Sequence, residues 1–304
     1  MVRLETIVNK LNKEFNIKEY GKDPSFSRFI PHVYENIQFD WKSSFENEFI
    51  HLFNGLMIKG EENVGTIYLA VFPTDHVLER FISKGRSGDL LFMHHPLLME
   101  CGDPKGKWGK GFIPIKEKYI KQLKEKKLSV YTCHIPMDSH EQLGPNIAIA
   151  HELKVDVTDV KDDIQKNNFI LYGTIEPTNT DNLIATLKSI FDIPYVNFAG
   201  PKKHEIKKVA IVAGCGDIVD WMKDAEHNGA DAYITGEIHC HIDNEYGRQK
   251  YREMKNFIPN TSMSLIAVSH SASEYLVHKT LMKEWFEKKF NIQTVLLPQE
   301  KWWL

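Results

Sequence analysis

Residues that bind metal ions occur in three separate segments of this sequence, and each segment follows a predicted strand. Polar side chains at the carboxyl ends of strands gather at one edge of an open α/β sheet, so we expect the segments to meet. Imidazole nitrogen and carboxylate oxygen are common ligands of divalent transition metals. The predicted metal ligands are His94, His95, Asp138, His270 and Glu274.

The pair His94-His95 can serve two ions only where its strand ends. Neighbouring side chains on a regular strand point to opposite faces, and Pro96 has no N–H with which to continue a ladder. Each ring could then bind a different ion. The alternative for this pair is two edge histidines that bond to the backbone.

The other two segments are ambiguous in isolation. Asp138 could be a hard oxygen ligand, and His134 a ligand, an acid–base group or an orienting group, although a loop Asp is often a turn or cap residue. On a helix that starts near residue 271, His270 and Glu274 would have Cβ atoms about 6 Å apart. They could grip one ion or bridge two, or they could be a cap and a first-turn Glu.

We expect two divalent ions about 3.5–4 Å apart, bridged by Glu274, with His134 or Glu237 moving protons. Mixed nitrogen and oxygen donors suit zinc, manganese, iron or cobalt better than calcium or magnesium, and do not select among them. Two further strand ends are weaker: 212–217 could cradle a phosphate or be a tight turn, and 235–241 could line the site or be a surface loop. Because no G-x-S-x-G elbow occurs, a serine hydrolase is disfavoured.

The elements that must position these groups alternate between strands and helices, which predicts an α/β protein with largely parallel sheets. Apolar runs predict strands at 49–53, 65–72, 89–93, 128–133, 169–173, 195–199, 207–213, 232–235, 265–268 and 292–297. Amphipathic spacing predicts helices at 1–15, 74–85, 115–127, 146–153, 181–191, 217–228 and 271–289.

The polar stretch at 156–168 indicates a domain boundary. We therefore expect two α/β domains of similar topology with a metal-binding cleft between them. The first would comprise residues 1–158 plus 262–304 and carry most of the ligands, and the second would comprise residues 159–261.

Composition narrows the class of protein. The chain has 304 residues, 42% hydrophobic content and a net charge of −3, which is enough for one or two domains and predicts neither a nucleic-acid nor a membrane partner. No apolar run approaches the roughly 20 residues of a membrane span. Four scattered cysteines and the absence of a signal-peptide pattern favour the cytoplasm. The basic segment 115–127 is typical of a solvated helix face, with a nucleic-acid surface as the alternative.

On these residues the sequence resembles the Nif-three-like family of dinuclear metal-centre hexameric proteins, often labelled GTP cyclohydrolase I type 2 homologues. The resemblance covers most of the chain. Its motifs are Asn54-Gly55-Leu56, His94-His95-Pro96-Leu97, His134-Ile135-Pro136-Met137-Asp138, Leu143-Gly144, Asn146, Gly214-Cys215-Gly216, Asp231-Ala232-Tyr233-Ile234-Thr235-Gly236-Glu237, and His270 with Glu274.

The resemblance implies two α/β domains with a metal cleft between them, and a toroidal homo-hexamer built from dimers. By analogy, His95 and Asp138 would hold one ion, His94 and His270 the other, and Glu274 would bridge them.

Two positions depart from the family pattern. Phe72 stands before the first helix of the α/β set, where many members carry Asp, and Ser269 stands before the last ligand histidine, where many carry Gly. Both changes concern the wall of the implied cleft, so they bear on the substrate more than on metal binding.

Two functions are consistent with the sequence. The first is a metal-dependent hydrolase that acts on a nucleotide or another phosphate-bearing molecule, GTP cyclohydrolase-like by resemblance. The second is a non-catalytic, metal-dependent regulatory or nucleic-acid-binding ring protein, which the lysines of 115–127 could support. A nucleotide-fold oxidoreductase is disfavoured because the glycine fingerprint is incomplete.

Overall fold

The chain divides into two α/β units in the computed structural model, which describes residues 1–163 and 168–303. The first unit comprises Met1–Met99, Phe112–His140 and His278–Glu300. The second comprises Glu100–Gly111, Glu141–Val277 and Lys301–Leu304. Residues 164–167, which belong to the predicted boundary at 156–168, and Leu304 lie outside the described residues.

The sheet of the first unit is mostly parallel and has the strand order β15-β4-β5-β8-β2. Its strands are β2 (Gly55–Ile58), β4 (Thr66–Ala70), β5 (Leu90–Met93), β8 (Ser129–Thr132) and β15 (Gln293–Leu296). The edge strand β2 runs antiparallel to β8, and the other neighbours pair in parallel. β5 is buried along its whole length, which explains why its sequence is an unbroken apolar run.

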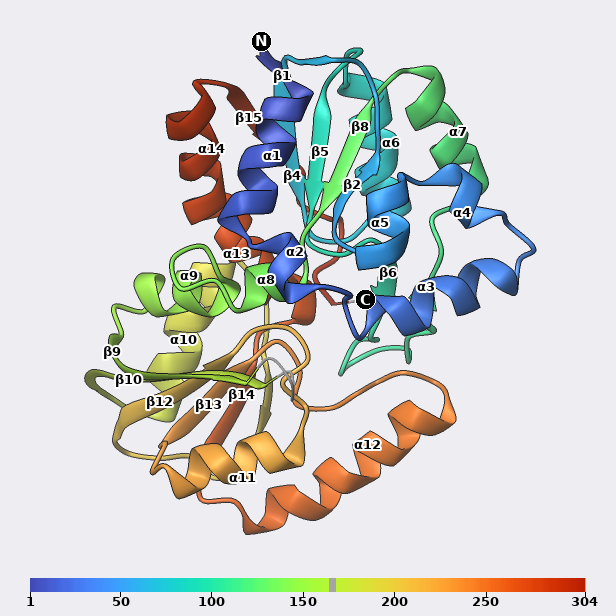
Figure 1. Ribbon diagram of the computed structural model, residues 1–304. Coiled ribbons are helices and arrows are strands. Elements are labelled where there is room, and N and C mark those ends of the chain that lie inside the picture. The colour runs from blue at the N-terminus through green and yellow to red at the C-terminus, as the bar shows by residue number, and fades with distance from the viewer. Residues whose placement is uncertain (164–167, 304) are drawn as a thin grey trace. The chain divides into compact units, whose positions relative to one another are not determined.

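Helices cover both faces of this sheet (Figure 1). Leu91 and Met93 of β5 belong to a core that includes residues of α6 (Asp75–Lys84) and α7 (Glu117–Glu125). Phe92 points to the opposite face, where its ring centroid lies 6.4 Å from that of Phe15 and 5.3 Å from that of Phe286. Those two rings belong to the end of α1 (Leu4–Glu14) and to α14 (Lys283–Phe290). Further helices of this unit are α2 (Ile17–Tyr20), α3 (Phe26–Glu35), α4 (Trp41–Ser44), α5 (Asn47–Leu52) and α8 (Ile135–Asp138).

The sheet of the second unit has the order β11-β14-β13-β12-β10-β9. Its strands are β9 (Asp156–Asp163), β10 (Asn168–Thr178), β11 (Asn197–Ala199), β12 (Ile206–Val212), β13 (Ala232–Thr235) and β14 (Ser264–Ala267). The central strands β12, β13 and β14 are parallel, and the outer strands pair antiparallel to their neighbours. The carboxyl ends of the three parallel strands therefore lie side by side at one edge.

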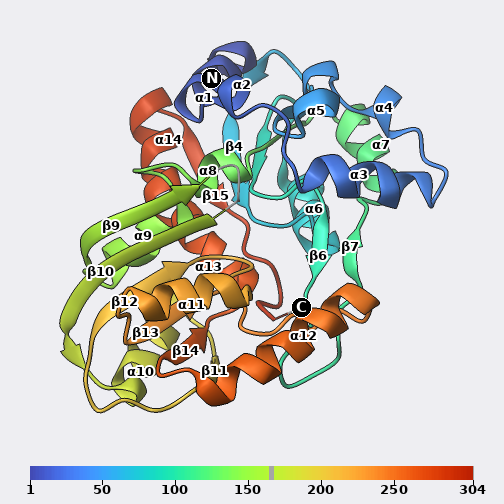
Figure 2. The same cartoon turned by 60° about the horizontal axis from the view of Figure 1, so that its bottom comes forward.

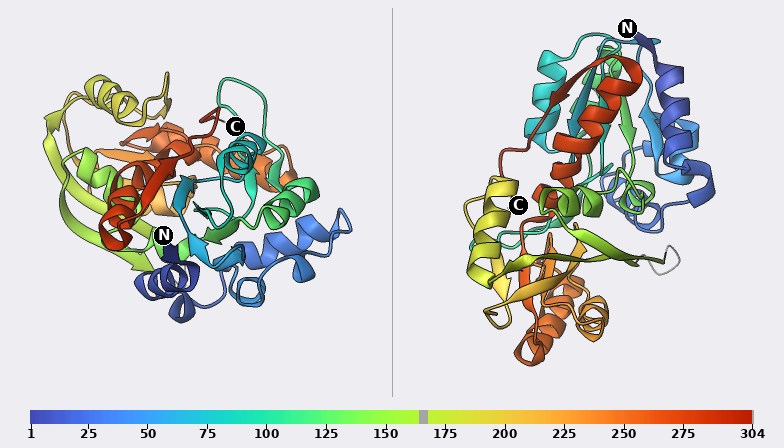
Figure 3. Two further views of the ribbon diagram at one scale, coloured as in Figure 1. Left: turned by 90° about the horizontal axis from the view of Figure 1, so that it is seen from above. Right: turned by 90° about the vertical axis from the view of Figure 1, so that its left-hand side faces the viewer.

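Helices also cover the second sheet. Its helices are α9 (Pro145–Glu152), α10 (Thr180–Phe191), α11 (Val219–His227), α12 (Glu245–Phe257) and α13 (His270–Val277). α11 and α12 lie on one face, and α10 lies on the other (Figures 2 and 3). Met222 of α11 and Met254 of α12 share a core with Tyr233 of β13.

Three stretches differ from the sequence prediction. Residues 49–53 were expected to form a strand, but α5 begins at Asn47, because the buried Phe45, Phe49 and Phe53 recur at the four-residue spacing of a helix. Part of the polar stretch at 156–168 is the edge strand β9, which pairs with β10 through its backbone and needs few apolar side chains. α12 was not predicted, because its sequence is mostly polar.

The helix expected at 271–289 is present with an interruption. It runs as α13, a π-helical segment from His278 to Met282, and α14. The division into units falls at this π-helical segment, between Val277 and His278.

The division of the chain also differs from the expected one. Residues 100–111, 141–158, 262–277 and 301–304 belong to the second unit. The reason is pairing: β14 forms a parallel ladder with β13, and α13 contacts α9.

Across the described residues, the helices are too short or too polar to cross a lipid bilayer.

Candidate metal centre

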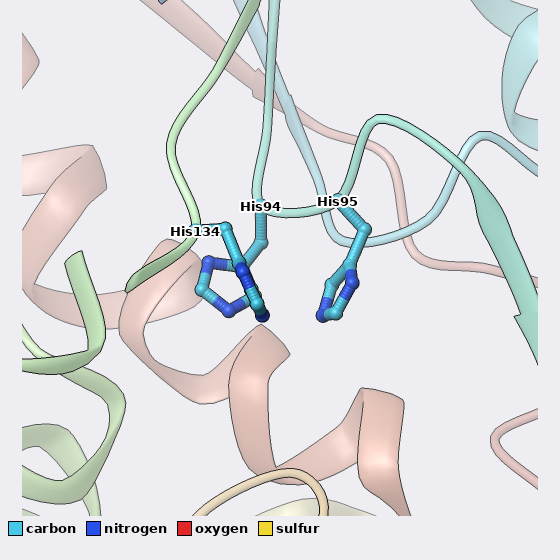
Figure 4. Close-up of side chains that lie close together, drawn as sticks. All are labelled: His94, His95 and His134. Carbon is cyan, nitrogen blue, oxygen red and sulfur yellow. The ribbon is translucent and has the colours of Figure 1, made fainter. Parts of the chain in front are cut away.

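Three histidine rings of the first unit face one another (Figure 4). His94 and His95 directly follow β5, and His134 follows β8, the neighbouring parallel strand. The ring centroids are 4.7 Å apart for His94 and His95, 5.3 Å for His94 and His134, and 4.9 Å for His95 and His134. One nitrogen of each ring lies within 4.8 Å of the others, so these three groups could hold a metal ion.

The orientation of His94 fits a metal ligand. Its Nδ1 lies 2.8 Å from the carbonyl oxygen of Cys133 and must carry the proton of the neutral ring, because a carbonyl only accepts. The Nε2 lone pair then points toward Asp138 Oδ1 at 3.2 Å. A lone pair and a carboxylate oxygen repel at this distance unless a proton or a cation lies between them. The donor set therefore fits a divalent ion.

Asp23 holds His134 in place. Asp23 Oδ2 lies 2.8 Å from His134 Nδ1, and Asn54 Oδ1 accepts the backbone N–H of His134 at 2.8 Å. The other oxygen of Asp23 accepts the N–H groups of Ser25 and Phe26, at the start of α3. Burial opposes ionisation of Asp23, but the charge of His134 and these hydrogen bonds lower its pKa below the usual value.

Aromatic rings surround the three histidines of the first unit. The centroid of Phe26 lies 4.6 Å from that of His134 and 5.5 Å from that of His95. Phe72 lies 4.5 Å from His95. The residue that departs from the family pattern thus forms part of an apolar wall against a predicted ligand, where an Asp would have placed a charge.

The second unit contains a cluster centred on His270, the first residue of α13. His270 Nε2 lies 2.9 Å from Glu274 Oε1, as the four-residue spacing predicted. His270 Nδ1 lies 2.5 Å from Glu237 Oε1. Two sulfur atoms are also close to Nδ1: Cys215 Sγ at 3.4 Å and Cys101 Sγ at 3.6 Å.

The charges of this cluster are interdependent. Burial alone would lower the pKa of His270, but the Glu274 carboxylate raises it well above the usual value. Burial raises the pKa of Cys215 to about 12, and burial likewise raises that of Cys101. Without a metal ion, these shifts favour the charged form of His270 and the protonated form of both thiols.

A tight turn after β12 makes room for Glu274. Gly214 has φ +68°, and a Cβ atom there would lie 2.5 Å from Glu274 Oε1. Its N–H donates to Ser273 Oγ at 2.9 Å, and its carbonyl accepts the N–H of Glu237. Of the two interpretations of residues 212–217, these contacts fit a turn packed against α13.

Ser269, the second departure from the family pattern, has φ +83°. This is the left-handed region that glycine adopts without steric cost. The backbone of this chain thus keeps a conformation suited to the glycine of other members, and Ser269 Oγ adds a hydrogen bond to the carbonyl of Trp302.

By unit, His94, His95, His134 and Asp138 belong to the first, and Glu237, His270 and Glu274 belong to the second. The sequence reasoning missed three residues that touch these groups: Asp23, Cys101 and Cys215. Only Cys215 had a signal, because it lies in a strand-end motif that had been considered for phosphate binding.

The other segment considered at a strand end, 235–241, divides in two. Glu237 faces His270, whereas the rings of His239 and His241 pack with Tyr251 of α12 at centroid distances of 5.0 and 5.5 Å. Burial lowers the pKa of His239 to about 4. These two histidines therefore belong to an aromatic cluster rather than to the candidate metal ligands.

The basic helix has partners within the fold. Lys116 pairs with Asp75, Lys121 Nζ lies 2.7 Å from Glu117 Oε1, and Lys126 Nζ donates to a backbone carbonyl of α6. α7 thus has the ion-paired, solvated face that its composition predicted.

Comparison with known proteins identifies relatives over most of the chain. The sequence model of the Duf34/NIF3 family (NGG1p interacting factor 3) matches residues 46–301. The GTP cyclohydrolase 1 type 2 homolog of Pyrococcus abyssi is 30% identical over 250 residues, which cover 80% of this chain and 88% of that protein. The protein of the same name from Pyrococcus horikoshii is 29% identical over 269 residues, covering 84% and 95%.

Solved structures share the fold. TTHA1606 from Thermus thermophilus has a TM-score of 0.64 at 19% identity and covers 99% of each chain. Reduced HcgD from Methanocaldococcus jannaschii has a TM-score of 0.61 at 17% identity and covers 97% of this chain and 98% of that one. At these identities the likeness concerns the fold alone.

Proposed function

The chain belongs to the Duf34/NIF3 family, and from that premise we propose that it is a metal-dependent hydrolase with a dinuclear centre. His95 and Asp138 would hold one divalent ion, His94 and His270 the other, and Glu274 would bridge them. The ions would be zinc, iron, manganese or cobalt, because the donors are imidazole nitrogens and carboxylate oxygens.

One observation carries the proposal: His94 bonds to a backbone carbonyl through Nδ1 and turns Nε2 toward another predicted ligand, 3.2 Å from Asp138 Oδ1. A ligating histidine commonly has this arrangement, with its second nitrogen bonded to a carbonyl or carboxylate. His270 repeats the pattern with Glu237 at Nδ1 and Glu274 at Nε2.

The protein's own groups would handle the protons. A pair of bound ions would lower the pKa of a water molecule and polarise the oxygens of the electrophile. His134 would accept and return a proton at Nε2, because Asp23 fixes its Nδ1. Glu237 would orient the His270 ring from Nδ1 and so keep Nε2 directed at its partner.

The substrate would be a nucleotide or another phosphate-bearing molecule. Support for this class comes from the relatives, which are named GTP cyclohydrolase 1 type 2 homologs. We also propose that the protein acts in the cytoplasm as a toroidal hexamer, which light scattering coupled to size-exclusion chromatography would test.

The test of function is an assay of the purified protein, loaded with manganese or zinc, on nucleotides and phosphoesters. We expect hydrolysis that chelation abolishes and that His94→Ala and Glu274→Ala each remove. His204→Ala, at an exposed histidine, is the control and should retain full activity. Hydrolysis that persists unchanged in both ligand variants would falsify the proposal.

A further inference from the structure

Three metal-binding groups of the second unit converge on His270 Nδ1, the nitrogen that faces away from Glu274. Cys215, Glu237 and His270 follow the adjacent parallel strands β12, β13 and β14, so their side chains reach the same edge of one sheet. Cys101 arrives from the segment Glu100–Gly111 of the same unit. Cys101, Glu237 and His270 are almost fully buried.

The distances between these donors approach those of a tetrahedral zinc site. Zinc–sulfur and zinc–nitrogen bonds of about 2.3 and 2.05 Å at a tetrahedral angle place sulfur and nitrogen about 3.5 Å apart. The two sulfur-to-Nδ1 distances are 3.4 and 3.6 Å. Cys215 Sγ lies 3.9 Å from Glu237 Oε1, again close to the tetrahedral separation.

One distance differs from the tetrahedral arrangement and has a simple cause. Glu237 Oε1 lies 2.5 Å from His270 Nδ1, where a tetrahedral ion would hold nitrogen and oxygen about 3.3 Å apart. A proton shared between these atoms accounts for the short contact. An ion that displaces this proton would need the two atoms to separate by under about 1 Å.

We infer that Cys101, Cys215, Glu237 and His270 Nδ1 form a metal site of their own, which takes a thiophilic divalent ion such as zinc or ferrous iron. Binding would release one proton from each thiol and one from Nδ1, with no change of oxidation state. Two thiolates select zinc or ferrous iron over manganese or magnesium.

This site shares only His270 with the proposed dinuclear centre. All four donors belong to the second unit, whereas His94, His95 and Asp138 belong to the first. His270 offers a different nitrogen to each site, since Glu274 faces Nε2 and the sulfurs face Nδ1. Loss of the histidine pair of the first unit should therefore leave the thiolate site intact.

Cobalt substitution provides the experiment. We expect metal-free protein, reduced and titrated with Co²⁺, to develop a thiolate-to-cobalt charge-transfer band in the near ultraviolet. The band should be lost in Cys101→Ser and Cys215→Ser, and zinc affinity at this site should fall at least about 100-fold. Cys240→Ser, which removes a buried thiol of the same unit outside this group, is the matched control and should keep the band.

A second variant separates this inference from the proposed function. The double variant His94→Ala/His95→Ala should lose dinuclear metal binding and activity, yet retain the charge-transfer band. If the serine variants do not fold, thiol labelling of the wild-type protein gives the answer: zinc should protect Cys215, the half-buried thiol of the site, from labelling. The absence of a thiolate band, or equal labelling with and without zinc, would overturn the site.

Discussion

The two histidine clusters of this protein are built by opposite means. In the first unit, His94, His95 and His134 stand ring to ring against aromatic side chains, and a backbone carbonyl and Asp23 fix two of them. In the second unit, one imidazole is surrounded by anionic or acidic partners on both nitrogens.

This difference predicts different behaviour without metal. The first cluster consists mainly of imidazole nitrogens. A bound ion would supply positive charge next to its carboxylate, Asp138, which lies 3.2 Å from His94 Nε2. The second cluster balances its carboxylates with a proton on His270, whose pKa Glu274 raises despite burial. Metal binding there must displace protons.

The largest expected effect comes from removing one ligand of each cluster. His95→Ala and Glu274→Ala should each lower metal affinity by at least about 100-fold, because each change deletes a direct ligand. Elemental analysis of protein purified without added metal, beside the wild type, measures it. Full metal content in either variant would remove that cluster from the proposed centre.

The next effect concerns the residue behind His270. Glu237→Ala removes the acceptor at His270 Nδ1 and should lower the metal affinity of the dinuclear centre by about 10- to 100-fold. Glu237→Gln keeps an acceptor oxygen and should lower that affinity less. Competitive titration with a chelating dye gives the affinities. Identical affinities in both variants and the wild type would mean that Glu237 does not orient the ring.

Alanine variants of two glycines distinguish the effect of backbone strain from that of side-chain crowding at the second cluster. Gly214 and Gly229 both have positive φ, so Gly214→Ala and Gly229→Ala should each cost about 1–2 kcal/mol of folding stability. Only Gly214→Ala should also weaken metal binding, because its Cβ would lie 2.5 Å from Glu274 Oε1, while nothing lies within 4 Å at Gly229. Urea unfolding and metal titration measure the two effects, and equal metal affinities would contradict the crowding.

Asp23 gives the first cluster a pH dependence. Its pKa is lowered in the folded protein, so its ionised form stabilises the fold above the unfolded pKa of about 3.9, and this contribution is lost as pH falls. Asp23→Asn keeps a helix-capping oxygen and should reduce this loss in acid, whereas Asp23→Ala should cost a further ~1 kcal/mol. Unfolding curves from pH 3 to 7 test this, and parallel profiles for the wild type and Asp23→Asn would oppose it.

The smallest effect is expected outside both clusters. Lys121→Ala on α7 removes an exposed ion pair with Glu117 and should leave stability and metal content unchanged. It also tests the nucleic-acid-binding alternative. A regulatory ring protein would be favoured over a hydrolase by one result. The protein would bind an oligonucleotide in a salt-dependent way, this variant would weaken the binding, and metal removal would leave it intact.

Much of the first cluster could be predicted from the sequence because its signal is local. The apolar runs that became β5 and β8 end directly at His94 and before His134, so strand periodicity alone places these rings at one sheet edge. The four-residue spacing of His270 and Glu274 likewise predicted their contact. Periodicity failed where side-chain chemistry was uninformative, as in the charged edge strand β9 and the polar helix α12.

By itself, the sequence determined most of the order of strands and helices, the family, and the residue types at each strand end, because these depend on neighbours along the chain. The tertiary structure decided which groups meet from a distance. Asp23 and His134 are 111 residues apart in sequence, and Cys101 and His270 are 169 apart. Such contacts depend on the packing of whole sheets and helices, and no local pattern of residues encodes them.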